Sequence, residues 1–298
     1  MTHRLFQVFG LGQCCLDYLT TIGDYPPPDS KCEFSELAIQ GGGPVATAMV
    51  ALSRWGLSCA VAGIVGDDDF GSAVTKSLQN EGVDTRGLLV RTGAGSQFAF
   101  ITAEPGTGRR TVFWRRPTGT PPRPDEIELD AVRRAAVFYT DGIWIDASLA
   151  AAHAARRAGG SVVVDAGSLR EGMLDLARLS DFFVASDKFS RQLTGGDDPP
   201  AACRKIAALG PRVAGVTLGE RGYIVLHEGT VIERPAFRVD TVDTTGCGDV
   251  FHAGVAYGVV SGWDVARSLD FGAWAAAMVS TRLGGREGIP KKENYPQW

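Results

Sequence analysis

The chain has 298 residues, of which 44% are hydrophobic and 21% charged, an ordinary globular mixture that can bury a full core. Its formal net charge of −4 argues against a protein that binds nucleic acid or anionic membranes, because such proteins usually carry a basic surplus. No apolar run approaches the length that crosses a bilayer, and the N-terminal "MTHRLFQVFGLG" turns polar too early for a secretory signal. We therefore expect a soluble cytoplasmic protein.

The cysteines and histidines predict neither a disulfide framework nor a structural metal. The six cysteines show no CxxC spacing, and in a chain of this length reduced thiols are favoured over disulfides. The four histidines are scattered, and none is paired with Cys or Glu at the spacing of a zinc site.

Short β-branched or aromatic runs alternate with helical patterns along the chain. Strands are predicted over residues 6–12, 59–65, 161–167, 181–186, 213–219 and 223–229. Several are apolar at consecutive positions, which is typical of strands buried on both faces. Helices are predicted over residues 44–55, 70–80, 147–158, 200–209, 248–260 and 264–282. The alternation predicts an α/β fold with a mostly parallel sheet and helices on both faces.

Two stretches depart from this alternation. Residues 31–40, "KCEFSELAIQ", follow the turn-rich "YPPPDS", and residues 96–116 form a predicted hairpin that turns at residues 105–108. Both are predicted to be antiparallel strands with no helix between them. They would form a small β lid over the carboxyl ends of the main strands, where ligands bind in open α/β sheets.

The first of two glycine clusters, "QGGGPVATAMVALSRWG", spans residues 40–56. Pro44 suits the first position of a helix, and one face of that helix is apolar. The glycines before it allow the backbone to approach a ligand closely. A tight strand-to-helix turn explains the cluster equally well.

The second cluster, "TVDTTGCGDVFHAG", spans residues 241–254 and places Gly246, Cys247 and Gly248 directly before a helix. A helix N-terminus has free N–H groups and a partial positive charge, so small residues there favour a bound phosphate. Asp249 then lies in the first turn, where an ionised carboxylate can accept the proton of an attacking hydroxyl. Asp249 could instead simply favour the helix start, but Asp243, Thr244 and Thr245 add acceptors for a cation or a phosphate-bound metal.

Other nucleotide and hydrolase motifs are absent. The chain has no GxxxxGK[ST], no GxSxG and no HExxH. "GLGQCC" begins like a dinucleotide fingerprint, but Cys15 stands where the third glycine should be. A dehydrogenase is therefore the least favoured of the functions that the sequence suggests.

The two glycine clusters together resemble the signatures of the ribokinase-like (PfkB) carbohydrate kinases. "GGGPVATAMVALSRWG" is similar to the first signature, and "DTTGCGDVFHAG" is similar to the second, which is commonly DTTGAGD. "GIVGDDDFG", "VTLGERG" and the C-terminal "RLGGREGIP" extend the resemblance through most of the chain. Within the family, the branch that contains 6-deoxy-6-sulfofructose kinase is most similar, and ketohexokinase is more distant.

The resemblance implies a single ribokinase-like domain over residues 1–298, with a Rossmann-like three-layer αβα body and a small β lid. It implies ATP-dependent phosphorylation of a sugar hydroxyl, with Asp249 as the base and the backbone of Gly246, Cys247 and Gly248 as the anion hole. It further implies ATP with Mg²⁺ and, in some members, a monovalent cation such as K⁺. The resemblance also implies that Asp17, Gly42 and Gly43 contact the sugar. It implies nucleotide contacts at Thr217, Gly219 and Gly222, and contacts with the monovalent cation at Asp243 and Thr245.

Three departures from the family pattern matter. Cys247 replaces the usual alanine, but it is small enough to keep the anion hole. The frequent NxxE motif is replaced by "SDKF" at residues 186–189, which lacks both the Asn and the Glu of that metal-organising contact. Many members carry an Asn after the first glycines, where this chain has Pro44 and Val45, so one sugar contact is in doubt.

We therefore expect an ATP:sugar phosphotransferase that binds neither nucleic acid nor membrane. Lys31 sits where a lid residue could meet an anionic substituent of the substrate, or it could be a solvated lid charge, and the same holds for the hairpin arginines. A nucleoside kinase on the same fold is an alternative, with Phe113 and Trp114 as a wall for the base. A non-catalytic sensor of sugars or nucleotides is another. Exposed edges of the lid strands make a homodimer plausible.

Overall fold

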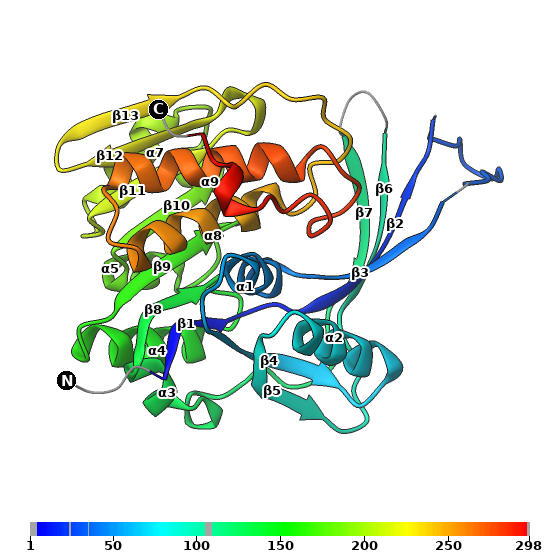
Figure 1. The fold of residues 1–298 in the computed structure, drawn as a ribbon, viewed down its shortest axis with the longest axis horizontal. Coiled ribbons are helices and arrows are strands. Elements are labelled where there is room, and N and C mark those ends of the chain that lie inside the picture. Colours follow the sequence, from blue (N-terminus) through cyan, green and yellow to red (C-terminus); the bar gives the residue numbers. More distant parts are fainter. Residues whose placement is uncertain (1–4, 24, 35, 105–108, 297–298) are drawn as a thin grey trace.

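The computed structural model describes residues 5–23, 25–34, 36–104 and 109–296. Within these ranges the strands form two sheets, one of nine strands and one of four. In Figure 1 the larger sheet runs through the body of the molecule, and the smaller one projects from its side.

The larger sheet has the strand order β13-β12-β11-β10-β9-β8-β1-β4-β5. From β5 to β11 the neighbours are parallel, and β12 and β13 continue antiparallel at one edge. Because the chain runs outward in both directions from the β8–β1 pair, the order reverses there, and ligands bind at such switch points. The strands are β1 (Phe6–Leu11), β4 (Cys59–Gly66), β5 (Asp84–Arg91), β8 (Ala135–Thr140), β9 (Ser161–Ala166), β10 (Phe182–Ser186), β11 (Val213–Thr217), β12 (Tyr223–His227) and β13 (Thr230–Arg234).

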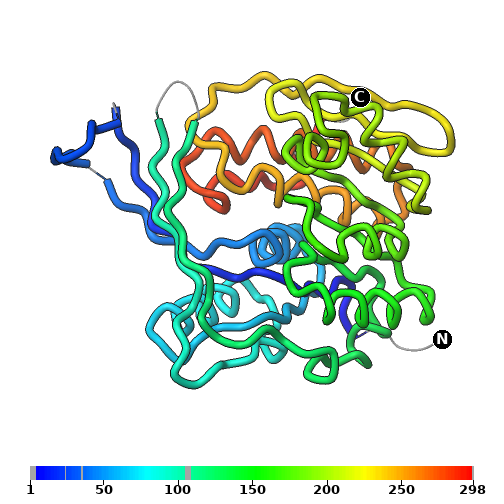
Figure 2. The backbone as a smooth tube through the Cα atoms, turned by 180° about the vertical axis from the view of Figure 1, so that it is seen from behind, coloured from blue at the N-terminus to red at the C-terminus, as the bar shows by residue number. Residues whose placement is uncertain are grey.

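Helices cover both faces of this sheet, which confirms the predicted three-layer α/β arrangement. One face carries α1 (Pro44–Arg54), α2 (Asp69–Asn80), α8 (Cys247–Val260) and α9 (Val265–Val279). The other face, seen from behind in Figure 2, carries α3 (Leu129–Arg133), α4 (Ile145–Arg157), α5 (Met173–Leu179), α6 (Asp187–Thr194) and α7 (Pro199–Ala207). Among the described residues, no helix combines the length and apolar character needed to cross a membrane.

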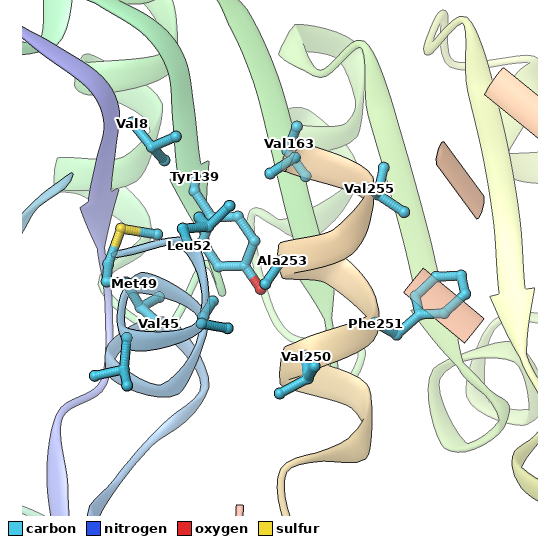
Figure 3. Close-up of a cluster of buried hydrophobic side chains, with 14 of the residues drawn as sticks. Val8, Val45, Met49, Leu52, Tyr139, Val163, Val250, Phe251, Ala253 and Val255 are labelled. Atoms are coloured by element: carbon cyan, nitrogen blue, oxygen red, sulfur yellow. The ribbon is translucent and has the colours of Figure 1, made fainter. Parts of the chain in front are cut away.

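The core between α1 and α8 fixes the relative position of the two glycine-led helix starts. The two helices lie side by side above the sheet, where Val45, Met49 and Leu52 of α1 and Val250 and Ala253 of α8 belong to one buried cluster (Figure 3). All five side chains are fully buried. Burial of a side chain of the size of Val, Leu or Met contributes about 1.5–3 kcal/mol, so this contact holds both N-termini at the same side of the sheet.

The smaller sheet has the order β3-β2-β6-β7 and projects from the body in Figure 1; it contains the strands predicted to act as a lid, and we call it the lid below. Its strands are β2 (Cys15–Thr21), β3 (Ala38–Gly42), β6 (Phe98–Ala103) and β7 (Arg110–Arg115). The hairpin predicted over residues 96–116 is the antiparallel pair β6–β7. Its predicted turn at residues 105–108 lies outside the described residues.

The strand predicted over residues 31–40 begins only at Ala38. Residues 31–34, 36 and 37 lie outside any helix or strand. The register explains the late start, because Ala38 pairs with Leu19, and the hydroxyl of Thr20 donates to the carbonyl of Glu36 at 2.6 Å. Before Ala38 the segment is thus joined to β2 through a side-chain hydrogen bond and lies outside the β2–β3 ladder.

Candidate active site

The second glycine cluster forms the N-terminus of α8. Gly246 is the N-cap residue with φ 76°, a conformation that favours glycine. A Cβ at Gly246 would lie 2.4 Å from Cα of Gly285, so the C-terminal loop packs directly on this backbone. Gly248 has open space in front of it and is exposed. The backbone of the first turn is therefore accessible, as an anion hole requires.

Asp249 lies in the first turn of α8, as predicted. Burial, and then the carboxylate of Asp165, raise the pKa of Asp249 from 3.8 to about 8, while the guanidinium of Arg110 opposes this rise. A base with a pKa near the operating pH is well suited to proton transfer. The site thus contains a carboxyl group whose ionisation state is set by its neighbours.

Asp17 reaches the same site from the lid strand β2. It is only 6% exposed, and its Oδ1 accepts a hydrogen bond from the thiol of Cys15 at 2.9 Å. Burial raises the pKa of Asp17, and the Cys15 hydrogen bond and the charge of Arg286 act in the opposite direction. The charge of Asp17 also contributes to the raised pKa of Asp249, so the two predicted carboxylates are electrostatically connected.

The glycines of the first cluster lie beside Asp17. Gly42 is opposite Cys15 in the β2–β3 pair, and a Cβ on Gly42 would come within 1.8 Å of Oδ2 of Asp17. Only glycine leaves room for that carboxylate. Gly43 is the N-cap residue of α1, and Pro44 is its first residue, as the sequence predicted. Direct contact of Gly42 and Gly43 with a sugar stays a prediction.

Asp243 and Thr245 organise the loop before α8. Oδ1 of Asp243 accepts hydrogen bonds from the backbone N–H of Thr245 at 2.9 Å and from its hydroxyl at 2.8 Å. Oδ2 of Asp243 accepts from the N–H of Gly284 at 2.8 Å, which fastens the C-terminal loop. Within the described residues, no group of three or more His, Cys, Asp or Glu side chains could hold a metal. A role of the two residues as cation ligands stays a prediction.

The predicted nucleotide residues lie beyond the end of β11. Thr217 ends this strand, and its hydroxyl donates to the carbonyl of Ala185 at 3.4 Å. Gly219 faces open space, whereas Gly222 packs against the backbone of Arg234. The structure therefore leaves Gly219 accessible and gives Gly222 a packing role.

The segment that replaces the NxxE motif starts α6. Ser186 caps this helix, because its hydroxyl accepts from the N–H of Phe189 at 3.1 Å. Asp187 forms ion pairs with Arg191 at 2.9 Å and with Arg221 at 3.3 Å. Instead of an Asn and a Glu, this position thus carries a carboxylate that is paired with two arginines.

A lid arginine reaches the loop before α8. The guanidinium of Arg110, on β7, donates to the hydroxyl of Thr244. Its positive charge acts on both Cys247 and Asp249. Lys31, by contrast, lies exposed in the segment between β2 and β3. Arg110 is therefore a charge of the predicted lid hairpin that contacts the loop before α8.

Two buried carboxylates at the ends of neighbouring strands were missed from the sequence. Asp141 follows β8, and its carboxylate accepts from the N–H groups of Gln13 and Ile143. Burial raises the pKa of Asp141 to about 6. Asp165 lies near the end of β9 and is 8% exposed. The signal that could have found them is an acid directly after an apolar strand, in "VFYTDG" and "VVVDAG".

Comparison with known proteins agrees with this geometry. The profile of the pfkB family carbohydrate kinases matches residues 9–292. Probable fructokinase-4 of Arabidopsis thaliana is 30% identical over 82% of this chain and 79% of its own length. A crystal structure described as a candidate ribokinase from Agrobacterium tumefaciens is 26% identical, with a TM-score of 0.89 over 96% of this chain and 94% of that one. The ribokinase of Arabidopsis thaliana, solved with ribose and ATP, shares the fold at 20% identity, with a TM-score of 0.78 over 97% and 96% of the two chains.

The fold and site are those of a ribokinase-like phosphotransferase. The chain belongs to the pfkB family of carbohydrate kinases. It is a sugar kinase, which transfers phosphate to an alcohol group. The predicted family is therefore confirmed, while the predicted likeness to 6-deoxy-6-sulfofructose kinase stays a prediction.

Proposed function

We propose that this chain transfers the γ-phosphoryl group of ATP to a hydroxyl of a small sugar, with Asp249 as the general base. The observation that carries the proposal is the pairing of an accessible helix N-terminus at Gly246, Cys247 and Gly248 with the perturbed carboxyl of Asp249 in the same turn. A perturbed carboxyl beside an anion site is the arrangement that proton abstraction and phosphoryl transfer need together.

Each residue has a separate task in this reaction. Asp17 accepts hydrogen bonds from sugar hydroxyls and holds one of them near Asp249. Asp249 takes the proton of that hydroxyl as the hydroxyl oxygen attacks the γ-phosphorus of ATP, the bond from that phosphorus to the β–γ bridging oxygen breaks, and ADP leaves. The amides at the α8 N-terminus stabilise the charge on the phosphoryl oxygens. Thr217 and Gly219 line the nucleotide, and Gly222 packs near them against the backbone of Arg234. Mg²⁺ supplies charge neutralisation to the ATP phosphates when it is bound.

Arg110 is suited to stabilise the same phosphoryl group. Its guanidinium already contacts Thr244 and acts on the anion-hole residue Cys247. Because β7 belongs to the lid, closure of the lid over a sugar would bring this charge with it and exclude water as a competing acceptor.

The acceptor is best identified by an ADP-release assay with ATP, Mg²⁺ and a panel of ketoses, aldoses, sugar acids and nucleosides, with and without K⁺. We expect turnover with a sugar or sugar acid and little with nucleosides. A nucleoside as the best acceptor would favour the alternative reading, in which Phe113 and Trp114 contact the base. If no compound of the panel is phosphorylated, but sugars still bind in a thermal-shift assay, a non-catalytic sensor would be favoured.

We also propose that the protein forms a homodimer through its lid. The outer strand β7 exposes Val112, Phe113 and Trp114, and β3 exposes Ile39. Exposed apolar side chains on a strand at the edge of a sheet favour pairing with another strand. Sedimentation equilibrium of the intact chain and of Trp114→Lys tests this, and a monomeric wild type would refute it.

A further inference from the structure

His252 lies three residues after Asp249 on α8 and is only 2% exposed. Its ring is held between two backbone carbonyl groups. Nδ1 lies 2.7 Å from the carbonyl oxygen of Gly248, and Nε2 lies 3.0 Å from the carbonyl oxygen of Val184 on β10. The ring therefore connects the turn that carries the anion hole to the central sheet.

These two contacts define the protonation of the ring. A carbonyl oxygen only accepts hydrogen bonds, whereas a neutral imidazole has one N–H donor and one nitrogen lone pair. In either neutral tautomer, a lone pair would face a carbonyl oxygen without a proton between them. At this degree of burial a group left without its hydrogen bond is costly. A hydrogen bond to each carbonyl oxygen therefore requires that both nitrogens of His252 donate, as they do in an imidazolium.

A counterion for this ring lies beside it. Oδ2 of Asp165 is 3.5 Å from Nδ1 of His252 and 3.4 Å from the hydroxyl of Tyr139. Across the described part of the chain, His252 is the partner with which Asp165 forms an ion pair. A buried carboxylate needs an opposite charge nearby, and here the imidazolium supplies it.

Asp165 is also close enough to influence Asp249. After burial, its charge is the largest influence that raises the pKa of Asp249. Tyr139, whose ring lies against α8 in Figure 3, is affected by both carboxylates. An unopposed Asp165 would therefore favour protonated Asp249, which cannot accept a proton. The other ionisable groups that act on or beside Asp249 are Arg110 of β7, Asp17 of β2, Asp141 after β8 and Cys247 of α8.

We propose that His252 is a positioning residue of the phosphoryl transfer: its imidazolium neutralises Asp165, so that the Asp249 carboxylate stays ionised beside the acceptor hydroxyl. The same ring holds the carbonyl of Gly248 and thereby the first turn of α8. This inference rests on the proposed role of Asp249 as the base, but the protonation of His252 is testable without any turnover.

The first measurement is ¹⁵N NMR of the histidine rings in the intact protein at mildly alkaline pH, where exposed histidines lose their second proton. The chain has four histidines, and the signals of His252 are assigned by their loss in His252→Asn. His153, exposed on α4, is the internal control. We expect two protonated nitrogens in His252 at a pH at which the signals of the exposed control change with pH. A single protonated nitrogen in His252 would overturn the inference whether or not Asp249 is the base.

The second measurement is the pH dependence of kcat/KM for the sugar in wild type, His252→Asn, Asp165→Asn and the double variant. The acid limb is the part of the profile in which kcat/KM falls as the pH is lowered. Removal of the imidazolium leaves the charge of Asp165 unopposed, so the midpoint of this limb in His252→Asn should move up by about one pH unit. Removal of the carboxylate should move the limb of Asp165→Asn down, and the double variant should return close to wild type. A purely structural His252 would lower kcat without moving the limb, and that result would overturn the tuning role.

If His252→Asn does not fold, Asp165→Asn alone still tests the proposal. The acid limb of Asp165→Asn must move to lower pH if His252 and Asp165 act as a pair, and an unmoved limb would count against the proposal. Near-normal turnover of Asp249→Asn would instead contradict the proposed function and, with it, the tuning role of His252. Two protonated ring nitrogens in His252 would still stand as a separate finding.

Discussion

The two ends of the candidate site differ in how deeply their charged side chains are buried. At the predicted acceptor end, Asp17 and Asp165 are buried and Asp249 is partly exposed, and burial raises the pKa values of Asp17 and Asp249. At the predicted nucleotide end, Asp187 pairs with Arg221 and Arg191 at the surface. Buried charges interact strongly and exposed pairs weakly, so we expect charge substitutions to change turnover strongly at the predicted acceptor end and nucleotide binding only modestly at the predicted nucleotide end.

Individual glycines of the site also differ in how closely they are packed. An added Cβ at Gly42 would lie 1.8 Å from a carboxylate oxygen, and one at Gly246 would lie 2.4 Å from a backbone Cα. An added Cβ at Gly219, at the nucleotide end, meets nothing within 4 Å. Gly222 is packed as closely as Gly42, because an added Cβ there would lie 1.9 Å from the carbonyl oxygen of Arg234. Substitutions should therefore have large effects at Gly42, Gly246 and Gly222 and a small effect at Gly219.

The largest expected effect is that of Asp249→Asn. The amide keeps the shape of the side chain but cannot accept the proton, so kcat should fall by roughly 10²–10⁴-fold. ATP binding, measured by calorimetry, should remain within a few fold of wild type. A variant that keeps near-normal turnover would show that another group deprotonates the acceptor.

Gly42→Ala should have the next largest effect. The new methyl group displaces Asp17, and loss of hydrogen bonds to a charged group costs about 1.5–3 kcal/mol, or roughly 10- to 100-fold in kcat/KM for the sugar. The KM for ATP should change little. Gly23→Ala, which adds a methyl group into open space just after β2, is the matched control and should behave like wild type. Equal behaviour of the two variants would contradict the proposed contact of Asp17 with the sugar.

The smallest effect is expected for Arg221→Ala at the nucleotide end. Its ion pairs with Asp187 at 3.3 Å and with Asp197 at 3.7 Å are half exposed. Exposed pairs contribute about 0.2–1 kcal/mol, so the KM for ATP should change by less than about fivefold. Arg221→Lys keeps the charge and is the control. A loss of kcat/KM as large as that expected for Gly42→Ala would contradict the proposed difference between the two ends of the site.

Much of the fold was predictable because the signals are local. Pro44 and the glycines before it predict the start of α1, and Gly246 to Asp249 predict the start of α8, since the geometry of a helix end is set by a few adjacent residues. The strands β2, β5, β8 and β13 were not predicted. In β2, Asp17 lies in the interior of the strand and is tolerated only because Gly42 across the sheet makes room for it.

The electrostatics of the site could not be predicted from the sequence. The carbonyl that meets Nε2 of His252 is 68 residues away, and Thr244, which Arg110 contacts, is 134 residues from it. The charge state of a buried group depends on such neighbours, and they become adjacent only when the sheet and the lid have formed. Asp249 was found by its motif, while Asp165 and His252 required the structure.

The most direct test of the account is the pH dependence of kcat/KM for the sugar at saturating ATP. Because Asp249 must be ionised to act, activity should be lost as the pH falls through its pKa, with a midpoint well above 3.8 and no higher than about 8. The residual activity of Asp249→Asn should lack this acid limb. A wild-type midpoint near that of an ordinary aspartate, or the same limb in the variant, would contradict the claim that the carboxyl of Asp249 is the base.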